Sequence, residues 1–297
     1  MLVLLAALLW PLTTQASPPL PEPVVLLHGF DSHPRMWRGT ERLLIDSGFE
    51  PIAIAWRPEP GMRVPQAATQ VVLPAIRHEL ARRGYRSDAP WSAVGHSTGG
   101  LVLRWIAEHP HADADAVLPG GFWGGDGAPD GDPVLAARLR TLVMLSTPSR
   151  GARTGVARIA CDTWHDAAWR ELACDLIPGV PLLEHLGARK PNGVSARYLA
   201  IGVETSPNLL PAPLFDGNGD GLASTHDNSV MAESGWLAGA PFVIWRGKRQ
   251  RSHFSVSCSS TVNAWIAEFL DGGPAPVQPI GRQQSEDICG PISQESP

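Results

Sequence analysis

A serine flanked by glycines is the residue of this sequence best placed to act as a nucleophile. Ser97 lies in residues 95–100 (Gly-His-Ser-Thr-Gly-Gly), between a short apolar run suited to a buried strand and an apolar run suited to a buried helix. So tight a turn strains the serine backbone and brings neighbouring chain close, which requires Gly95 and Gly99 to lack side chains. The helix dipole would favour a developing anion there. The segment predicts a nucleophile elbow.

The elements around this segment alternate between strand and helix signals, as a mostly parallel sheet requires. Apolar runs predict strands at residues 24–27, 52–56, 91–94, 142–145, 198–203 and 242–245. Helical patterns cover residues 40–48, 66–83 with an interruption at Pro74, 101–109 and 262–270. A Gly/Asp-rich insertion, residues 119–133, is predicted to be a solvent-exposed loop. The pattern indicates an α/β protein.

Four signatures, in this order, make the chain resemble an α/β-hydrolase of the bacterial secreted lipase and esterase kind. They are a strand followed by residues 28–30 (His-Gly-Phe), the elbow, residues 146–151 (Ser-Thr-Pro-Ser-Arg-Gly) after a strand, and residues 219–222 (Gly-Asp-Gly-Leu) before a late histidine. The resemblance covers most of residues 23–271. It implies an α/β-hydrolase fold, with a mostly parallel central sheet flanked by helices and a cap or lid insertion. It also implies hydrolysis of carboxylic esters, with an acyl-ester or lipid as substrate.

The serine hydroxyl needs an imidazole to take its proton and a carboxylate to hold that imidazole in the right tautomer. In the fold that the chain resembles, the order along the chain is serine, acid, histidine. Beyond residue 220 the histidines are His226 and His253. We favour His253, which follows the last predicted strand and precedes the last helix, because His226 would share a loop with the acid.

The acid is predicted within a loop rich in aspartate. In the lipases that the chain resembles, the acid directly precedes Gly-Leu or Gly-Val, which selects Asp220, with Asp216 and Asp227 as alternatives. No cofactor is required by this chemistry. The same loop also matches a calcium-binding pattern, with ligands from Asp216, Asn218, Asp220, the Leu222 carbonyl, Ser224 and Asp227. Asp220 can hardly serve both purposes, so calcium is the competing interpretation and no metal is assigned to the catalytic site.

Two backbone N–H groups are predicted to bind the anion formed when Ser97 attacks an ester. The resemblance and the geometry of the turn place one at Thr98, directly after the nucleophile, and one at Phe30. His28 is expected to brace the loop by hydrogen bonding rather than to take part in the reaction.

Residues 149–192 do not follow the strand and helix alternation and are predicted to form the cap or lid. Two of the four cysteines, Cys161 and Cys174, lie in this range, while Cys258 and Cys289 lie near the C-terminus. Three pairings are open to four cysteines, and the local one, Cys161–Cys174 with Cys258–Cys289, closes the shortest loops. An even number of cysteines favours disulfides in an exported chain.

The N-terminal residues 1–16 resemble a secretory signal peptide, which predicts export to the periplasm or outside the cell. Residues 17–271 would form the hydrolase domain and residues 272–297 a C-terminal tail. The net charge of −5 gives no electrostatic reason to expect nucleic acid. A transient contact with a lipid surface is a further expectation, and the oligomeric state is left open.

Two other functions remain open at this point. A thioesterase or an acyltransferase would use the same three residues and differ in leaving group or acceptor. A binding or chaperone-like protein without activity is the alternative from another class, although such a protein has no need of all three residues in order.

Overall fold

The computed structural model describes residues 19–109, 131–152, 156–188, 195–204, 240–246, 253 and 256–277. Its centre is a six-stranded sheet with the order β2-β1-β3-β4-β5-β6, in which all paired strands are parallel. The strands are β1 (Glu22–Leu27), β2 (Phe49–Ile54), β3 (Trp91–His96), β4 (Leu139–Leu145), β5 (Arg197–Glu204) and β6 (Phe242–Arg246). Every predicted strand is confirmed, although β2 begins and ends earlier than residues 52–56.

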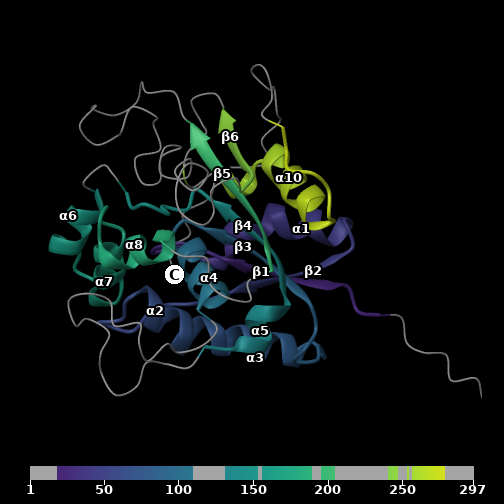
Figure 1. Cartoon of the computed structure of the whole chain (residues 1–297), viewed down its shortest axis with the longest axis horizontal. Helices are drawn as coiled ribbons and strands as arrows, with labels where there is room; N and C mark the ends of the chain where they lie inside the picture. Colours follow the sequence, from purple (N-terminus) through teal and green to yellow (C-terminus); the bar gives the residue numbers. More distant parts are fainter. Residues whose placement is uncertain are drawn as a thin grey trace, which may run out of the picture.

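Helices cover both faces of the sheet (Figure 1). The helices are η1 (Pro34–Trp37), α1 (Arg38–Asp46), α2 (Val64–Gln66), η2 (Ala67–Val72), α3 (Leu73–Arg82), α4 (Thr98–Glu108), α5 (Pro133–Arg138), α6 (Val156–Thr163), α7 (Ala167–Asp175), α8 (Pro181–Ala188), η4 (Val256–Cys258) and α10 (Ser260–Leu270). One face packs against η1, α1 and α10, and the other against α2 to α5 together with α6 to α8. The architecture is therefore the predicted three-layer α/β arrangement.

Strand β1 shows why the strands are almost entirely apolar. Val24 and Leu26 belong to the core beneath α1 and α10, while Val25 and Leu27 belong to the core beneath α3 and α4. Alternate side chains of a strand point to opposite faces, so a parallel strand covered on both faces must be apolar at every position.

The α-helical geometry predicted from residue 66 is interrupted just before Pro74, but the chain stays helical through this point. Residues Ala67–Val72 widen into a π-helix, in which the N–H of Leu73 donates to the carbonyl of Ala68, five residues earlier. Proline has no N–H to donate to the preceding turn, and a π-bulge accommodates such a defect within a continuous helix.

Helix α5 was not predicted, although its start carries a recognisable signal. The Asp132 carboxylate accepts a hydrogen bond from the N–H of Leu135 at 2.9 Å, and Pro133 occupies the first turn. Aspartate before a helix and proline at its first position are both favourable because the first N–H groups of a helix lack internal acceptors.

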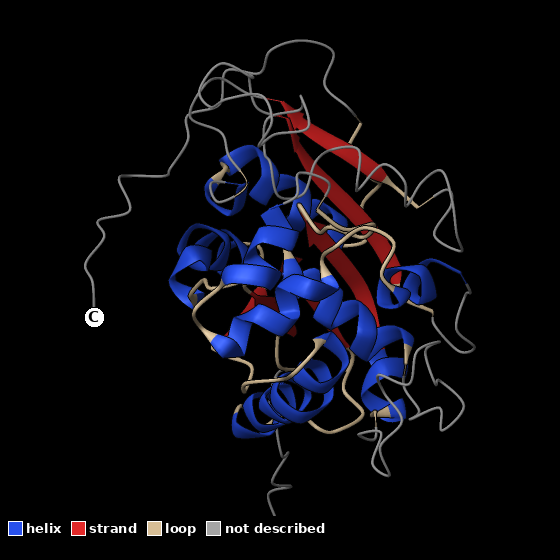
Figure 2. Cartoon of the chain, turned by 90° about the vertical axis from the view of Figure 1, so that its left-hand side faces the viewer, coloured by secondary structure: helices blue, strands red, loops and turns tan. Residues whose placement is uncertain are grey.

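Three helices, α6 to α8, lie between β4 and β5, within the range predicted to form a cap. Figure 2 views the molecule from their side and shows them in front of the sheet. None of the helices in the described ranges is long and apolar enough to cross a membrane.

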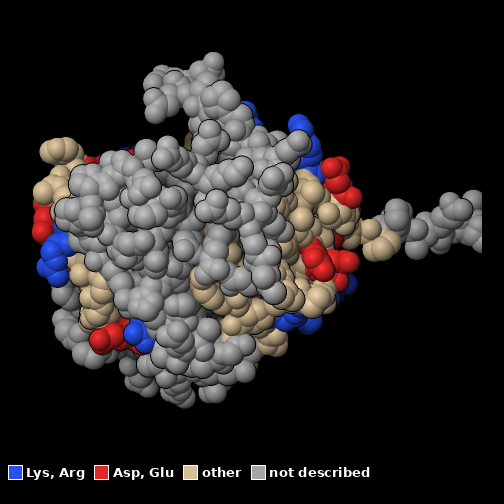
Figure 3. Space-filling view, turned by 90° about the horizontal axis from the view of Figure 1, so that it is seen from above, with Lys and Arg blue, Asp and Glu red and all other residues tan. Residues whose placement is uncertain are grey.

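Charged side chains on the described part of the surface are mixed in sign. The view from above shows acidic and basic residues next to one another around the rim (Figure 3). Some of them form local pairs, such as Arg86 with Asp88 at 2.9 Å and Arg77 with Asp132 at 2.6 Å. Such exposed pairs contribute little to stability.

Candidate active site

Ser97 occupies a sharp turn between β3 and α4. Its backbone has φ 53° and ψ −129°, a conformation that non-glycine residues rarely adopt, and its side chain is buried. The N–H of Ser97 donates to the carbonyl of Leu145 at 2.8 Å, which fixes the turn to the last residue of β4. The turn has the strained backbone expected of a nucleophile elbow.

Close backbone contacts explain the glycines of this turn. A Cβ at Gly95 would lie 2.6 Å from the Cα of Gly100, and a Cβ at Gly99 would lie 2.5 Å from the carbonyl oxygen of Leu27. Across the turn, a Cβ at Gly29 would lie 2.7 Å from the Cβ of Ser97. The loop after β1 and the elbow can therefore meet only because these positions carry no side chain.

His28 braces the loop that faces Ser97, in agreement with the role expected for it. Its Nδ1–H donates to the carbonyl of Gly29 at 2.9 Å, and its own carbonyl accepts the indole N–H of Trp56 at 3.0 Å. Burial lowers the pKa of His28 to about 4, so its ring is neutral at neutral pH.

Phe30 and Thr98 directly follow Gly29 and Ser97, the two residues that approach each other here. Thr98 is the first residue of α4, where N–H groups have no acceptor within the helix. Among the hydrogen bonds of the described residues, none uses the N–H of Phe30 or of Thr98. The two groups therefore stay our predicted donors to an anion beside Ser97.

His253, the predicted base, lies beside the elbow. Its carbonyl oxygen is 2.8 Å from Nε2 of His96, the residue before Ser97, and the two imidazole ring centroids are 4.6 Å apart. Burial lowers the pKa of His253 to about 4, which leaves the ring neutral and able to accept a proton at neutral pH. The structure therefore brings Ser97, His253, Phe30 and Thr98 into one region.

The predicted acid lies outside the described residues. This applies to Asp220, to the alternatives Asp216 and Asp227, and to the calcium-binding pattern as a whole. Within the described ranges no group of three or more His, Cys, Asp or Glu side chains could hold a metal ion. The predicted signal peptide and most of the predicted C-terminal tail also lie outside the residues that the structure describes.

The segment from α6 to α8, called the cap below because it lies in the range predicted to form one, contacts the loop that carries Phe30 through aromatic side chains. The sequence did not predict these contacts. The Phe30 ring lies 5.2 Å from Trp164 in an edge-to-face contact and 5.2 Å from Trp169, and Trp169 lies 5.3 Å from Trp56. Such contacts are favourable beyond the area they bury. They join α7 and the segment before it to the predicted anion site.

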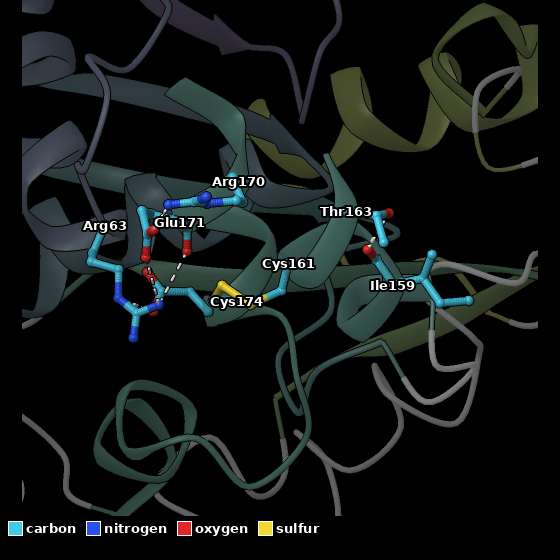
Figure 4. The surroundings of a disulfide bond; sticks show 8 residues. Arg63, Ile159, Cys161, Thr163, Arg170, Glu171 and Cys174 are labelled. Atoms are coloured by element: carbon cyan, nitrogen blue, oxygen red, sulfur yellow. Dashed lines mark hydrogen bonds and ion pairs between the residues drawn. A yellow bond between two sulfur atoms is a disulfide. The ribbon is translucent and has the colours of Figure 1, made fainter. Parts of the chain in front are cut away.

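A disulfide holds this part of the cap together. Cys161 of α6 is bonded to Cys174 of α7, which confirms one of the two bonds in the local pairing (Figure 4). The other bond of that pairing would need Cys289, which lies outside the described residues. Beside the disulfide, Nε of Arg63 lies 3.2 Å from a carboxylate oxygen of the buried Asp175. The cap is thus attached to the segment that follows β2.

A buried ion pair joins the elbow helix to the cap helix α8. Nε of Arg104 donates to Glu108 at 2.7 Å, and a terminal nitrogen of Arg104 donates both to Glu108 at 3.0 Å and to the carbonyl of Leu186 at 2.8 Å. Both charged side chains are almost completely buried. The spacing of four residues within the helix permits this pair.

A parallel sheet covered by helices on both faces, with a strained serine between β3 and α4, defines the α/β-hydrolase fold. No protein-family model matches the sequence, and no curated protein matches it. Solved structures that share the fold include lipases and esterases.

The lipase BlEst2 of Bacillus licheniformis, in its mature form, aligns over 86% of this chain and 94% of its own at 14% sequence identity, with a TM-score of 0.54. EstA of Clostridium botulinum aligns over 86% and 88% at 11% identity, with a TM-score of 0.52. The monoacylglycerol lipase of Paleococcus ferrophilus aligns over 85% and 95% at 14% identity, with a TM-score of 0.51. At these identities the comparisons establish the fold.

Proposed function

We propose that the protein is a serine hydrolase that cleaves carboxylic esters, with acyl-lipid esters as its substrate class. The observation that carries the proposal is the strained, buried Ser97 at the elbow, with the His253 backbone bonded to the neighbouring residue. His253 lies beside His96, the residue before Ser97, although the two histidines are far apart in the sequence. Among the described residues, the N–H groups of Phe30 and Thr98 have no acceptor. The lipases and esterases that share the fold add support.

In the first half of the reaction, the Ser97 oxygen attacks the ester carbonyl carbon while the imidazole of His253 takes the hydroxyl proton. The carbonyl oxygen becomes an anion and accepts hydrogen bonds from the N–H groups of Phe30 and Thr98. Each such donor contributes about 3 kcal/mol to the transition state in comparable sites. The carbon–oxygen bond to the alcohol then breaks, and the alcohol leaves with the proton from His253.

In the second half, water attacks the acyl group on Ser97 and gives a proton to His253. The acid leaves and the serine oxygen regains that proton, so the enzyme returns to its starting state. The neutral ring of His253 suits this role, but its low pKa also means that the imidazolium needs a carboxylate partner. Asp220 remains our prediction for that partner, with Asp216 and Asp227 as alternatives.

Export is part of the proposal. The Cys161–Cys174 disulfide supports it, because disulfides persist in oxidising compartments and are rare in the cytosol. The predicted signal peptide, residues 1–16, would direct that export.

Hydrolysis of p-nitrophenyl butyrate and p-nitrophenyl palmitate by the oxidised protein tests the proposed activity. We expect Ser97→Ala to lower kcat by roughly 10⁴-fold or more, and the exposed Ser47→Ala, at the end of α1, to leave it unchanged. A fluorophosphonate probe should label the wild type and Ser47→Ala but not Ser97→Ala. Hydrolysis that survives Ser97→Ala would refute the assignment of the nucleophile.

Further substrates separate the neighbouring functions. Thioester and phospholipid panels, assayed with the same variants, show whether the leaving group is an alcohol or a thiol. If properly oxidised protein hydrolyses no acyl donor and takes up no fluorophosphonate, the binding or chaperone-like alternative is favoured.

Calcium needs a separate test, since the predicted loop offers ligands for it. If calcium binds the folded protein, EDTA should lower the melting temperature and added calcium should restore it. A melting temperature indifferent to both excludes calcium as a structural ligand.

A further inference from the structure

His96 is the last residue of β3 and directly precedes the candidate nucleophile. Its side chain is almost completely buried, and its Nε2 lies 2.8 Å from the carbonyl oxygen of His253, 157 residues further along the chain. A carbonyl oxygen can only accept a hydrogen bond, so Nε2 of His96 carries the hydrogen and donates it. This bond attaches the backbone of the candidate base to the strand that presents the serine.

The ring of His96 fills the space between the candidate base and the loop that carries Phe30. On one side its centroid lies 4.6 Å from that of the His253 ring, with 52° between the ring planes. On the other side, a Cβ at Gly29 would lie 3.2 Å from Nδ1 of His96. One side chain therefore touches both the oxyanion loop and the base.

A buried imidazole at this position lowers the stability of the fold unless its N–H makes a hydrogen bond. Among the described residues, Nδ1 of His96 has no hydrogen-bond partner, and a buried polar atom without a partner is unfavourable. A phenylalanine ring would fill a similar volume without that cost. What it could not supply is the Nε2–H that the carbonyl of His253 accepts.

We infer that His96 is a positioning residue that fixes the backbone of His253 against the elbow and so sets the distance between base and nucleophile. The inference rests on the proposed function, in which His253 takes the proton of Ser97. His253 belongs to the connection between β6 and α10, whereas β3 is a central, fully buried strand. A bond from the strand to the connection gives the base the rigidity of the sheet.

The charge state of His96 suits a fixed donor. Burial holds the pKa of His96 well below its usual range, and the neighbouring His253 adds to this effect. The ring therefore remains neutral through the neutral pH range, with its one hydrogen on Nε2. It would also remain neutral when His253 takes up a proton during the reaction.

The test uses variants that separate the donor from the ring. His96→Phe keeps a ring and removes the donor, while His96→Gln keeps an N–H at a similar distance from the backbone. We expect kcat for p-nitrophenyl butyrate to fall by about 30- to 100-fold in His96→Phe, because small misplacements of a catalytic group have effects of that size. KM should change by less than threefold, and His96→Gln should recover most of the lost activity. The exposed His78→Phe on α3 serves as the matched control.

A second readout follows His253 directly and does not depend on turnover. The Hε1 proton signal of His253 is titrated by NMR in the wild type, His96→Phe and His78→Phe. Loss of the bond should admit water to His253, so its pKa should rise toward 6.5 in His96→Phe and stay unchanged in the control. The acid limb of kcat/KM should move in the same direction.

The outcomes separate the inference from the proposed function. If His96→Phe folds, melts within a few degrees of the wild type and keeps both kcat and the titration of His253, the positioning role is refuted. If the wild type hydrolyses no ester, the proposed function fails, and the titration of His253 still decides whether His96 holds it. If His96→Phe does not fold, His96→Gln and His96→Leu are compared by the same two readouts. Wild-type values in His96→Gln together with a shifted titration and a lower kcat in His96→Leu support the role, whereas the same values in both variants refute it.

Discussion

Removing one partner of the buried Arg104–Glu108 pair should destabilise the protein strongly, and removing both should cost less than the sum of the two single losses. In Glu108→Leu the guanidinium of Arg104 stays buried without its carboxylate, and a guanidinium keeps its charge in proteins. Breaking a buried pair in this way costs about 3–5 kcal/mol of the free energy of unfolding. Both side chains are almost completely buried, so solvent screening reduces this value little.

The two single variants should differ in their dependence on pH. In Arg104→Met the buried Glu108 is left without its cation, but a carboxylate can take up a proton and so avoid an isolated charge. Arg104→Met should therefore be less destabilised at pH 5 than at pH 7, relative to the wild type. Glu108→Leu offers no such escape, so its loss should be nearly the same at both values.

The double variant Arg104→Met/Glu108→Leu removes both charges and keeps an apolar volume. Its remaining cost comes from the carbonyl of Leu186, which loses its donor, and from the buried hydroxyl of Tyr198, which lies beside the pair. An unpaired buried polar group costs about 1–3 kcal/mol. The double variant should thus lose less than the sum of the two single losses by several kcal/mol.

Urea unfolding followed by tryptophan fluorescence and by circular dichroism measures all four proteins at both pH values. Agreement of the two signals checks that unfolding is two-state. A loss of less than about 1 kcal/mol in Glu108→Leu, below the range for broken buried pairs, would contradict this prediction. Single losses that add up in the double variant would contradict it as well.

Three further predictions concern the cap, the elbow and pH. Replacing Cys161 and Cys174 together by alanine should lower the free energy of unfolding by about 3 kcal/mol, because the disulfide closes a loop of 13 residues and so reduces the entropy of the unfolded chain. Thermal and urea unfolding of the variant and the oxidised wild type measure this difference. An unchanged free energy of unfolding would contradict the prediction. Ser97→Gly should be more stable than Ser97→Ala by about 1 kcal/mol, because glycine relieves the positive φ while both lack the hydroxyl; equal melting temperatures would show that the turn carries no such strain. The pKa of His28 is about 4 in the folded protein and about 6.5 in the unfolded chain, so the unfolded state binds more protons in this window and stability falls as the pH drops through it. Compared with His28→Asn, the wild type should lose up to about 3 kcal/mol more between pH 7 and pH 4, and parallel pH profiles would exclude the effect.

Local patterns predicted the elements of the fold well because each element carries its own signal. Strand β3 and helix α4 are continuous apolar runs on either side of small residues, and that arrangement alone indicates an elbow at Ser97. Helix α5 had a comparable signal in Asp132 and Pro133. It was missed because it directly follows a Gly/Asp-rich segment whose composition indicates a loop.

Contacts between distant elements left no such signal. Nothing in the sequence near His96 indicates that its side chain reaches His253, because that bond depends on how the chain returns to the sheet after β6. The packing of Trp164 and Trp169 on Phe30 could not be predicted for the same reason, although both tryptophans lie in the range predicted to form the cap. Arg104 and Glu108 are different, since a charged pair four residues apart inside an apolar helix suggests a buried partner.

Asp31 and Ser146 share with Ser97 a left-handed backbone, with φ of 45° and 46°, and all three residues follow the carboxyl ends of parallel strands. Heat resistance could therefore be raised at this edge without removing the nucleophile. Glycine at Asp31 or Ser146 relieves the same kind of torsion, and at Ser146 it also deletes a buried hydroxyl that has no partner among the described residues. Asp31 and Ser146 are thus two positions at which stability can be raised without loss of the nucleophile. At Ser97 a gain in stability would cost the proposed catalytic activity.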